Sequence, residues 1–239
     1  MKLKILYLLL FFITALTAQN PADIDQTIGT GYIGFTQVRA IAVQPDGKIV
    51  VAGYIIFGTN NSTYQGRLAR FNTDGSIDSS FQSLPFPNDG IINDIALQSD
   101  GKILVAGNFS NFNGITVYKL IRLNIDGSFD SSFNYTIGGA SINSIAIQSD
   151  GKILVAGTIS VSFNGHSQKR LFRVNSNGSL DTSFDFGFIG FSSSYDQIYK
   201  VAVQSDGKIL VAGNFLAFNG DQQGLIIRFN SDGTKDNSF

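Results

Sequence analysis

A ten-residue stretch, QSDGKILVAG, occurs three times in this chain of 239 residues, at 98–107, 148–157 and 204–213. A near copy, QPDGKIVVAG, occupies residues 44–53. A second motif begins 24 to 26 residues after the start of each copy: RFNTDGSIDSSF, RLNIDGSFDSSF, RVNSNGSLDTSF and RFNSDGTKDNSF, at 70–81, 122–133, 173–184 and 228–239. Self-similarity with a period of about fifty residues indicates a propeller, a solenoid or another array of stacked units.

Each repeat divides into four predicted strands. In the third repeat, the alternating and β-branched INSIAIQ (142–148) predicts a first strand, and KILVAG (152–157) predicts a second. The Asp-Gly pair between them predicts a type I′ hairpin turn, at Asp46-Gly47, Asp100-Gly101, Asp150-Gly151 and Asp206-Gly207. A second Asp-Gly or Asn-Gly pair joins the third strand to a short fourth one. Because the second strand is apolar on both faces, we expect it to lie between stacked sheets.

These features predict an all-β fold, a β-propeller-type array of four-stranded antiparallel blades. All eighteen acidic residues are Asp, a turn residue, and the helix former Glu is absent. The four repeats are expected at about 37–84, 91–136, 142–187 and 198–239. A partial repeat element at 24–35 matches residues 180–191, which indicates that the repeats are part of a larger propeller. A β-solenoid is the alternative, although its coils are usually shorter.

Residues 1–18 have the pattern of a secretory signal peptide. Lys2 and Lys4 precede an apolar stretch at 5–16, and small residues follow it. Twelve residues are too few to span a bilayer. We therefore expect a domain at 19–239 that is secreted, to the extracellular space or the outer cell surface, with no membrane insertion after signal removal. The chain has no Cys, which excludes a disulfide framework.

The pairing of Q-x-D-G-K-I-L-V-A-G with R-x-N-x-D-G-S-x-D-x-S-F resembles the delta-60 repeat, a β-propeller-like module of bacterial extracellular and surface proteins. The resemblance covers about residues 24–239. It implies a secreted repeat scaffold, in chains that often continue into further blades or a C-terminal sorting domain. The family carries no agreed activity, so the resemblance specifies the fold and leaves the ligand open.

Charge and motifs exclude several function classes. The net charge is −1 with no basic run, which argues against nucleic acid as a partner. NIDGSFD (124–130) overlaps the tail of a calcium loop, but Arg122 stands where the first carboxylate ligand belongs, so a turn without metal is expected. His166, the single histidine, is expected in an exposed loop. No phosphate or dinucleotide motif occurs, and no cofactor is predicted.

The acidic residues provide no evident catalytic pair. Eleven of the eighteen Asp lie at repeat positions, and the other seven, Asp94 among them, are expected in solvated loops. A glycosidase needs two carboxylates at a set separation. We therefore predict a non-enzymatic scaffold or binding protein without catalytic residues. The alternatives are a loop-built propeller enzyme acting on extracellular glycans, and the propeller part of a larger adhesin or enzyme.

The repeats vary most in their longer loops. Strand direction places the loops between the second and third strands, together with the crossovers between repeats, on one face of the array, and the Asp-Gly turns on the other. Variable loops on a repeated scaffold are where binding is usually located. We therefore expect an extracellular protein or glycan to bind there, with Tyr64, Tyr135 and Tyr195 as ligand contacts. The phenylalanines of the repeated FNG are expected to pack between blades, at Phe112, Phe163 and Phe218.

Overall fold

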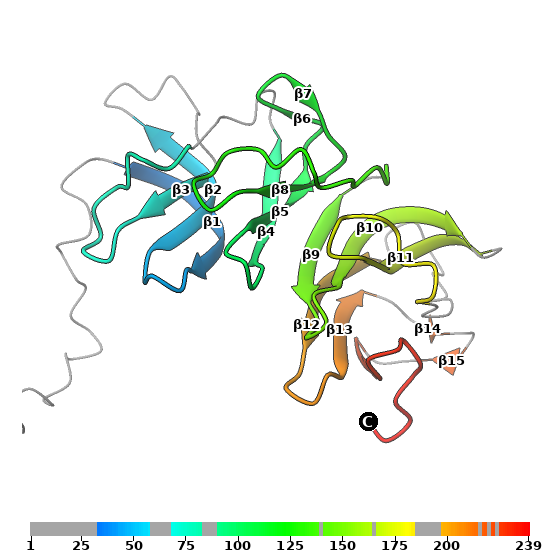
Figure 1. Ribbon diagram of the computed structural model, residues 1–239. Coiled ribbons are helices and arrows are strands. Elements are labelled where there is room, and N and C mark those ends of the chain that lie inside the picture. Colours follow the sequence, from blue (N-terminus) through cyan, green and yellow to red (C-terminus); the bar gives the residue numbers. More distant parts are fainter. Residues whose placement is uncertain are drawn as a thin grey trace, which may run out of the picture.

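The computed structural model describes residues 33–57, 68–82, 90–138, 141–163, 166–184, 197–214, 217–218, 221–222 and 225–239. All regular elements in these ranges are β-strands, and each of the four repeats forms one antiparallel sheet (Figure 1). The described ranges contain no helix with the length and apolar character needed to cross a membrane. The predicted all-β, repeated architecture is confirmed.

Each blade contains three strands in the order of the sequence, with the second strand in the middle. The first blade comprises β1 (Ile33–Val43), β2 (Ile49–Phe57) and β3 (Leu68–Phe71), and the second comprises β4 (Ile91–Leu97), β5 (Ile103–Asn108) and β8 (Leu120–Leu123). The third comprises β9 (Ile142–Ile147), β10 (Ile153–Phe163) and β11 (His166–Val174), and the fourth β12 (Gln197–Val203), β13 (Ile209–Asn214) and β16 (Ile226–Phe229). Two small hairpins extend the loops of the second and fourth blades: β6 (Asn111–Phe112) with β7 (Ile115–Thr116), and β14 (Ala217–Phe218) with β15 (Asp221–Gln222).

The expected fourth strand is reduced to a single bridge in each blade. The bridges are Phe71–Ile77, Leu123–Phe129, Val174–Leu180 and Phe229–Lys235. In the second blade, the Asp130 amide still donates to the Arg122 carbonyl at 3.0 Å, and the Phe133 amide then turns back to the Asp130 carbonyl. The chain therefore leaves the sheet at the aspartate of D-x-S-F, which ends the ladder after one pair.

The Asp-Gly turns differ from the predicted type I′. In the first blade the Gly47 amide donates to the Gln44 carbonyl and the Gln44 amide to the Lys48 carbonyl, which closes a three-residue loop. Gly47 has a φ of 83°, but the described non-glycine residues with positive φ are only Asn113 and Lys119, so Asp46 is not left-handed. This is a type I turn followed by a left-handed glycine, the usual three-residue hairpin. The prediction overlooked the third loop residue, Pro45 or Ser.

A type I′ turn does occur, at Asn113-Gly114 between β6 and β7. Both residues have positive φ, and Phe112 and Ile115 pair on either side of them. The Phe112 side chain is buried against Phe129 in the contact between the first two blades, as predicted. The side chains of Phe163 and Phe218 lie outside the described part of the structure.

The described core contains four clusters, and three of them lie between consecutive blades. The fourth, Val51, Ala69 and Phe71, belongs to the first blade alone. In the first, Val50, Ala52, Leu68 and Phe81 of one blade pack on Ile92, Ile95, Ile103 and Val105 of the next. The same pairing recurs between the second and third blades and between the third and fourth. We call the side of a blade that contacts the following blade its forward face, and the side that contacts the preceding blade its rear face. The middle strand is apolar on both faces because one face packs against the preceding blade and the other against the following blade.

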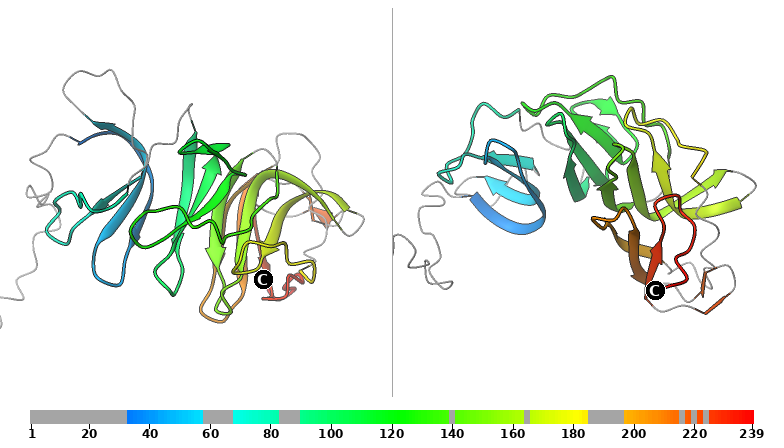
Figure 2. Two further views of the ribbon diagram at one scale, coloured as in Figure 1. Left: turned by 45° about the horizontal axis from the view of Figure 1, so that its top comes forward. Right: turned by 60° about the horizontal axis from the view of Figure 1, so that its bottom comes forward.

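The four blades stack into an open arc (Figure 2). The first strands of consecutive blades, β1, β4, β9 and β12, pack side by side. They form the inner edge of the arc, where the axis of a propeller would run. The first and fourth blades stand at opposite ends of the arc.

Candidate functional site

The inner strand of each blade contains a β-bulge at the same position. In β4, Ile92 lies opposite Gly107 and Asp94 lies opposite Ala106, so that Asn93 is the extra residue. The equivalent extra residues are Arg39 in β1, Asn143 in β9 and Tyr199 in β12. Bulges redirect a side chain and are frequent beside functional sites. Here they present one different side chain from each blade to the inner edge.

The glycine of VAG makes this bulge possible. A Cβ on Gly107 would lie 1.9 Å from the Ile91 carbonyl oxygen, and a Cβ on Gly157 would lie 2.1 Å from the Ser141 carbonyl oxygen. Only a residue without a side chain allows the bulged backbone to approach this closely. The repeated decapeptide therefore ends in glycine because it opposes the bulge.

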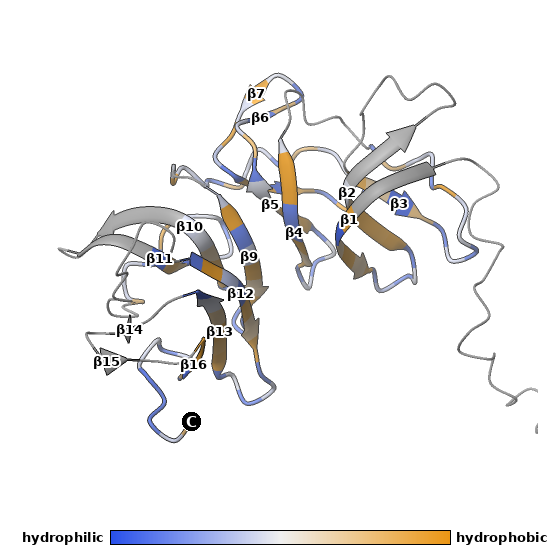
Figure 3. Cartoon of the chain, turned by 180° about the vertical axis from the view of Figure 1, so that it is seen from behind, coloured by the Kyte–Doolittle hydropathy of each residue, from blue (hydrophilic) through white to orange (hydrophobic). Residues whose placement is uncertain are grey.

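An open cleft of about 450 Å³ lies at the inner edge. It is lined by the four bulge residues, Arg39, Asn93, Asn143 and Tyr199, and by Gln197. Figure 3 shows hydrophilic segments within the otherwise hydrophobic strands β4, β9 and β12. Tyr199 is half exposed, at 52%. The lining combines amides, a guanidinium group and a phenol, which offer both hydrogen-bond donors and acceptors beside one aromatic ring.

Two of these residues also fix the spacing between blades. Asn93 Nδ2 donates to the Ile142 carbonyl at 2.8 Å, and Asn143 Nδ2 donates to the Ile198 carbonyl at the same distance. Arg39 Nη1 donates to Asn93 Oδ1 at 2.8 Å, and Gln197 Nε2 donates to the Tyr199 hydroxyl at 3.2 Å. Three of these hydrogen bonds connect consecutive blades, and the fourth lies within the fourth blade. Together they hold the cleft in shape.

Asp94, the residue after Asn93, stabilises the cleft through contacts with two other blades. The prediction that Asp94 lies in a solvated loop was wrong. Its carboxylate is buried on β4 and accepts from Ser144 Oγ and the Ile145 amide of the third blade, at 2.9 and 3.0 Å. Lys200 of the fourth blade forms an ion pair with the same oxygen at 2.9 Å. One carboxylate therefore connects three blades. With these donors in place, it is a structural group.

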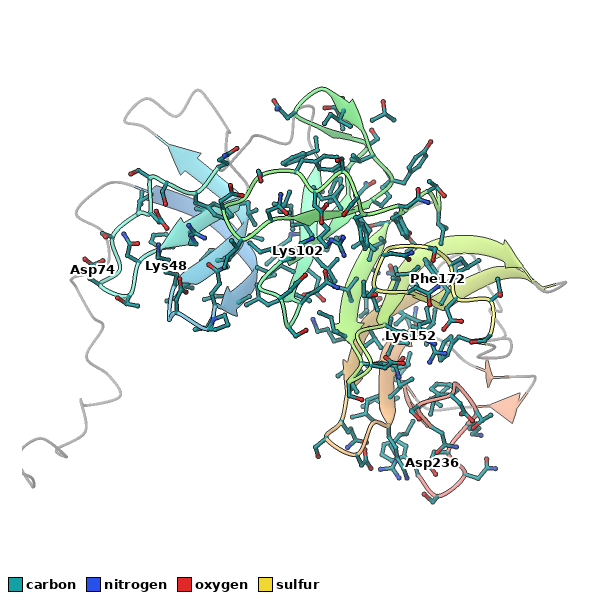
Figure 4. The ribbon with its side chains drawn as sticks, in the orientation of Figure 1. Lys48, Asp74, Lys102, Lys152, Phe172 and Asp236 are labelled. Atoms are coloured by element: carbon teal, nitrogen blue, oxygen red, sulfur yellow. The ribbon has the colours of Figure 1, made fainter. Side chains whose placement is uncertain are left out.

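A second polar cluster recurs at the opposite end of each blade and explains the repeated D-G-K. In the second blade, Lys102 Nζ and Arg122 Nε both bind Asp130 Oδ2, at 2.8 and 2.7 Å. The amide and hydroxyl of Ser132 donate to Asp130 Oδ1. We call Lys102, Arg122, Asp130 and Ser132 the charged cluster of this blade. Figure 4 shows Lys48, Lys102 and Lys152 at matching positions in three successive blades.

Every blade has the same cluster. The aspartates are Asp78, Asp130, Asp181 and Asp236, and each binds the lysine of D-G-K and the arginine of R-x-N. Each guanidinium also stacks on the phenylalanine that closes the repeat, at 4.4–4.8 Å from the ring centre. The lysine of D-G-K is therefore a partner of D-x-S-F, and neither motif indicates a phosphate or calcium site.

The arginines also bond to the following blade. Arg122 Nη1 donates to the Ser176 carbonyl at 2.7 Å and Arg173 Nη1 to the Ser231 carbonyl at 3.1 Å, and Arg70 contacts the Ile125 carbonyl in the same way. Within their own blades, Arg122 and Arg173 also donate to Gln98 and Gln148. The charged cluster is therefore part of the contact between blades.

The electrostatics of these carboxylates suit ion pairing rather than proton transfer. Burial alone would raise the pKa of Asp130, but hydrogen bonds from Lys102, Ser132 and Arg122 outweigh it and hold the pKa well below its usual range. Hydrogen bonds from Lys48 and Ser80 lower the pKa of Asp78 in the same way. Within the described residues, no group of three or more potential ligands is placed to hold a metal ion.

Of the three tyrosines predicted as ligand contacts, the structure describes only Tyr135. Tyr64 and Tyr195 lie outside the described residues. Tyr135 is buried between the second and third blades, where burial raises the pKa of its hydroxyl and leaves that hydroxyl without a partner. A contact by this residue would require its ring to leave the core. His166 begins strand β11 rather than lying in a loop, and its side chain is outside the description.

The sequence did contain a signal for the cleft. Along the inner strand, the repeats keep their apolar residues and their alanine, but the bulge position is Arg39, Asn93, Asn143 and Tyr199 in turn, and the next position is Ala40, Asp94, Ser144 and Lys200. Two adjacent variable positions inside a constant strand break its alternation. The prediction considered only the loops as variable and therefore missed them.

The model of a family described as "Domain of unknown function (DUF5122) beta-propeller" matches the chain at residues 44–81, 98–133, 148–184 and 204–239. No curated protein matches the chain. Among solved structures, a virginiamycin B lyase from Staphylococcus aureus aligns at 17% identity and a TM-score of 0.49, over 87% of this chain and 57% of that one.

Two further structures are similar to a comparable degree. A gluconolactonase from Xanthomonas campestris aligns at 14% identity and a TM-score of 0.45, over 83% of this chain and 60% of that one. The WD40 β-propeller domain of Doa1 aligns at 15% identity and a TM-score of 0.47, over 80% and 50%. The chain thus spans between half and three fifths of the length of these three structures.

Proposed function

The chain belongs to the DUF5122 β-propeller family, and from this premise we propose that it is a non-enzymatic binding protein that takes a hydroxyl-rich glycan in the cleft of its inner edge. The observation that carries the proposal is the series of equivalent bulges, which bring Arg39, Asn93, Asn143 and Tyr199 onto one surface. A scaffold alone would need no variation at these positions.

The chemistry of the lining supports a polyhydroxylated ligand. Amide side chains both donate and accept, as sugar hydroxyls do, and the exposed face of the Tyr199 ring can stack on the apolar face of a sugar. Open polar clefts of this kind differ from the mostly apolar pockets that bind compact small molecules. Of the two predicted ligand classes, protein and glycan, we therefore propose the glycan.

A binding role is favoured over glycan hydrolysis by the state of the carboxylates. A hydrolase needs a general acid whose pKa is raised toward the working pH. The carboxylates with large shifts, in the charged clusters, have lowered pKa values, and Asp94 is occupied by an ion pair and hydrogen bonds. We further propose, from residues 1–18, that the chain is exported and meets its ligand outside the cell. The narrower assignment to delta-60 repeats is proposed on the motifs alone.

The test uses the purified chain and a panel of soluble polysaccharides, including cellulose-derived, mannan and xylan probes, in affinity electrophoresis. We expect retardation by at least one glycan and its loss in Tyr199→Ala. Because an aromatic contact contributes about 0.5–1.5 kcal/mol, the apparent Kd should rise roughly two- to tenfold. Tyr118→Ala is the matched control, since Tyr118 is similarly exposed but lies outside the cleft. Equal losses in both variants, or no retardation by any probe, would refute the proposal.

A further inference from the structure

The two ends of the arc expose apolar side chains at positions that the contacts between blades bury elsewhere in the chain. On the forward face of the fourth blade, Phe239 is 63% exposed, whereas the equivalent Phe81, Phe133 and Phe184 are buried by the blade that follows. Ile226 is 54% exposed, whereas Leu68, Leu120 and Leu171 at the same position are buried. The fourth blade therefore has the forward face of the other three without its cover.

On the rear face of the first blade the inner strand shows the complementary pattern, whereas Val51, Ala69 and Phe71 on the other two strands of that face are buried. Ile41 is 63% exposed, whereas Ile95, Ile145 and Val201 at the same position are buried against the preceding blade. Val38 and Val43 on the same strand are exposed as well. Apolar side chains gathered on one face of a sheet mark a surface that another element covers.

Polar groups at the fourth blade lack the bonds that a following blade supplies. Arg70, Arg122 and Arg173 each donate to a carbonyl of the following blade. Arg228 has the ion pair to Asp236 and the bond to Ser238, but within the described residues no such carbonyl is present. In the second and third blades, the arginine Nη1 that donates to the following blade also donates to the glutamine of its own blade, Gln98 or Gln148, whereas the equivalent Gln204 Oε1 is buried without a partner. An unpartnered buried oxygen is costly and points to a missing contact.

We propose that a second copy of the chain covers these faces head to tail, with the forward face of one fourth blade on the rear face of the other first blade. The chain contains this interface three times already, so its geometry is specified. By equivalence, Arg228 donates to the Thr73 carbonyl of the second copy, as Arg122 does to Ser176, and Phe239 covers the turn at Gly75, as Phe81 covers Gly127.

The proposed contact is heterologous, and such contacts close when the rotation returns to the start. Two arcs that meet at both ends would close into one ring of blades, as in a propeller. Closure makes the second contact intramolecular, which strengthens both. The inner edges of the two copies, with both proposed glycan clefts, would then face one channel.

Light scattering coupled to size-exclusion chromatography of the purified chain tests this proposal. We expect twice the mass of one chain at micromolar concentration, and the mass of one chain for either Ile226→Asp or Ile41→Asp. A mixture of these two variants should regain dimers, because each retains the half that the other lacks. Ile115→Asp replaces an apolar side chain on β7 that is 44% exposed and lies away from both ends, and should leave the dimer intact.

Circular dichroism of each variant verifies that it is folded. A chain that is monomeric at every concentration overturns the proposal and assigns the two faces to another occupant, such as residues 1–32 or further blades. A dimer that survives both aspartate variants overturns it too. A mixture of the two variants that stays monomeric would show that the contact is not head to tail.

Discussion

Asp130→Asn should destabilise the chain more than any conservative change in the same turn. Asn can keep Oδ1 for the Ser132 amide and hydroxyl, but its Nδ2 would replace the oxygen that binds Lys102 Nζ and Arg122 Nε. The new Nδ2, Lys102 Nζ and Arg122 Nε are all donors, and they would face one another without an acceptor. The Arg122 guanidinium is buried. The variant replaces one oxygen by an NH2 group and leaves the side-chain volume nearly unchanged, so its cost reports the charge interaction.

The magnitude follows from the environment of the pair. Removing one partner of a buried ion pair costs about 3–5 kcal/mol, because a buried charge is left without compensation. The Lys102 side chain is 30% exposed and can turn to water, which recovers part of this. We therefore expect a loss of about 2–3 kcal/mol in the free energy of unfolding. For a chain of this size, that lowers the melting temperature by roughly 5–10 °C.

The third blade supplies the matched control. Asn177 stands where the second blade has Asp126, and both accept the same two hydrogen bonds from the serine two residues later, Ser179 and Ser128. Asp126→Asn should therefore change the stability by less than about 0.5 kcal/mol. Urea unfolding followed by circular dichroism compares the two variants. Equal stability of the two would refute the assignment of the charged cluster as a structural centre.

Three further predictions concern pH, packing and metal. The four cluster aspartates have lowered pKa values in the folded state, so their ionised forms stabilise the fold at pH values above the ordinary pKa of aspartate, near 3.9. This contribution is lost as the pH falls below about 4. Acid titration should therefore show a steep loss of melting temperature that begins there. Gly107→Ala should cost about 3 kcal/mol or more, because its Cβ would overlap the Ile91 carbonyl, whereas Gly138→Ala, with open space around it, should be neutral in the same urea titration. A chelator should leave the melting temperature unchanged, and a drop of several degrees would restore the calcium interpretation of the second turn.

The repeat architecture could be predicted because each blade carries the same local signals. The period, the paired glycine turns and the middle strand that is apolar on both faces together require stacked antiparallel sheets. The turn type was predicted incorrectly because Asp-Gly alone does not determine how many residues the loop contains. The bond between the Gln44 and Lys48 backbones, which closes a three-residue loop, is a property of the paired strands.

Long-range polar contacts could not be predicted from local pattern. Lys102 and Asp130 are 28 residues apart, and Asp94 and Lys200 are 106 apart, so the sequence gives no indication that they pair. Asp94 was expected in solvent because an isolated carboxylate usually is. Its burial depends on Ser144 and Lys200, which come from two other blades and meet it only in the folded arc.

The bulge explains how one strand can be constant and variable at once. A regular strand would assign alternate residues to the two faces of the blade, and a polar residue at either would disturb a contact with a neighbouring blade. At Asn93 the extra residue leaves the ladder, so its side chain points to the inner edge and no blade-to-blade core cluster contains it. Arg, Asn and Tyr can therefore occupy this position without entering the apolar core between blades. Gly107 allows the bulge at Asn93. We therefore infer that the repeated decapeptide maintains a variable position on the inner strand as well as a turn.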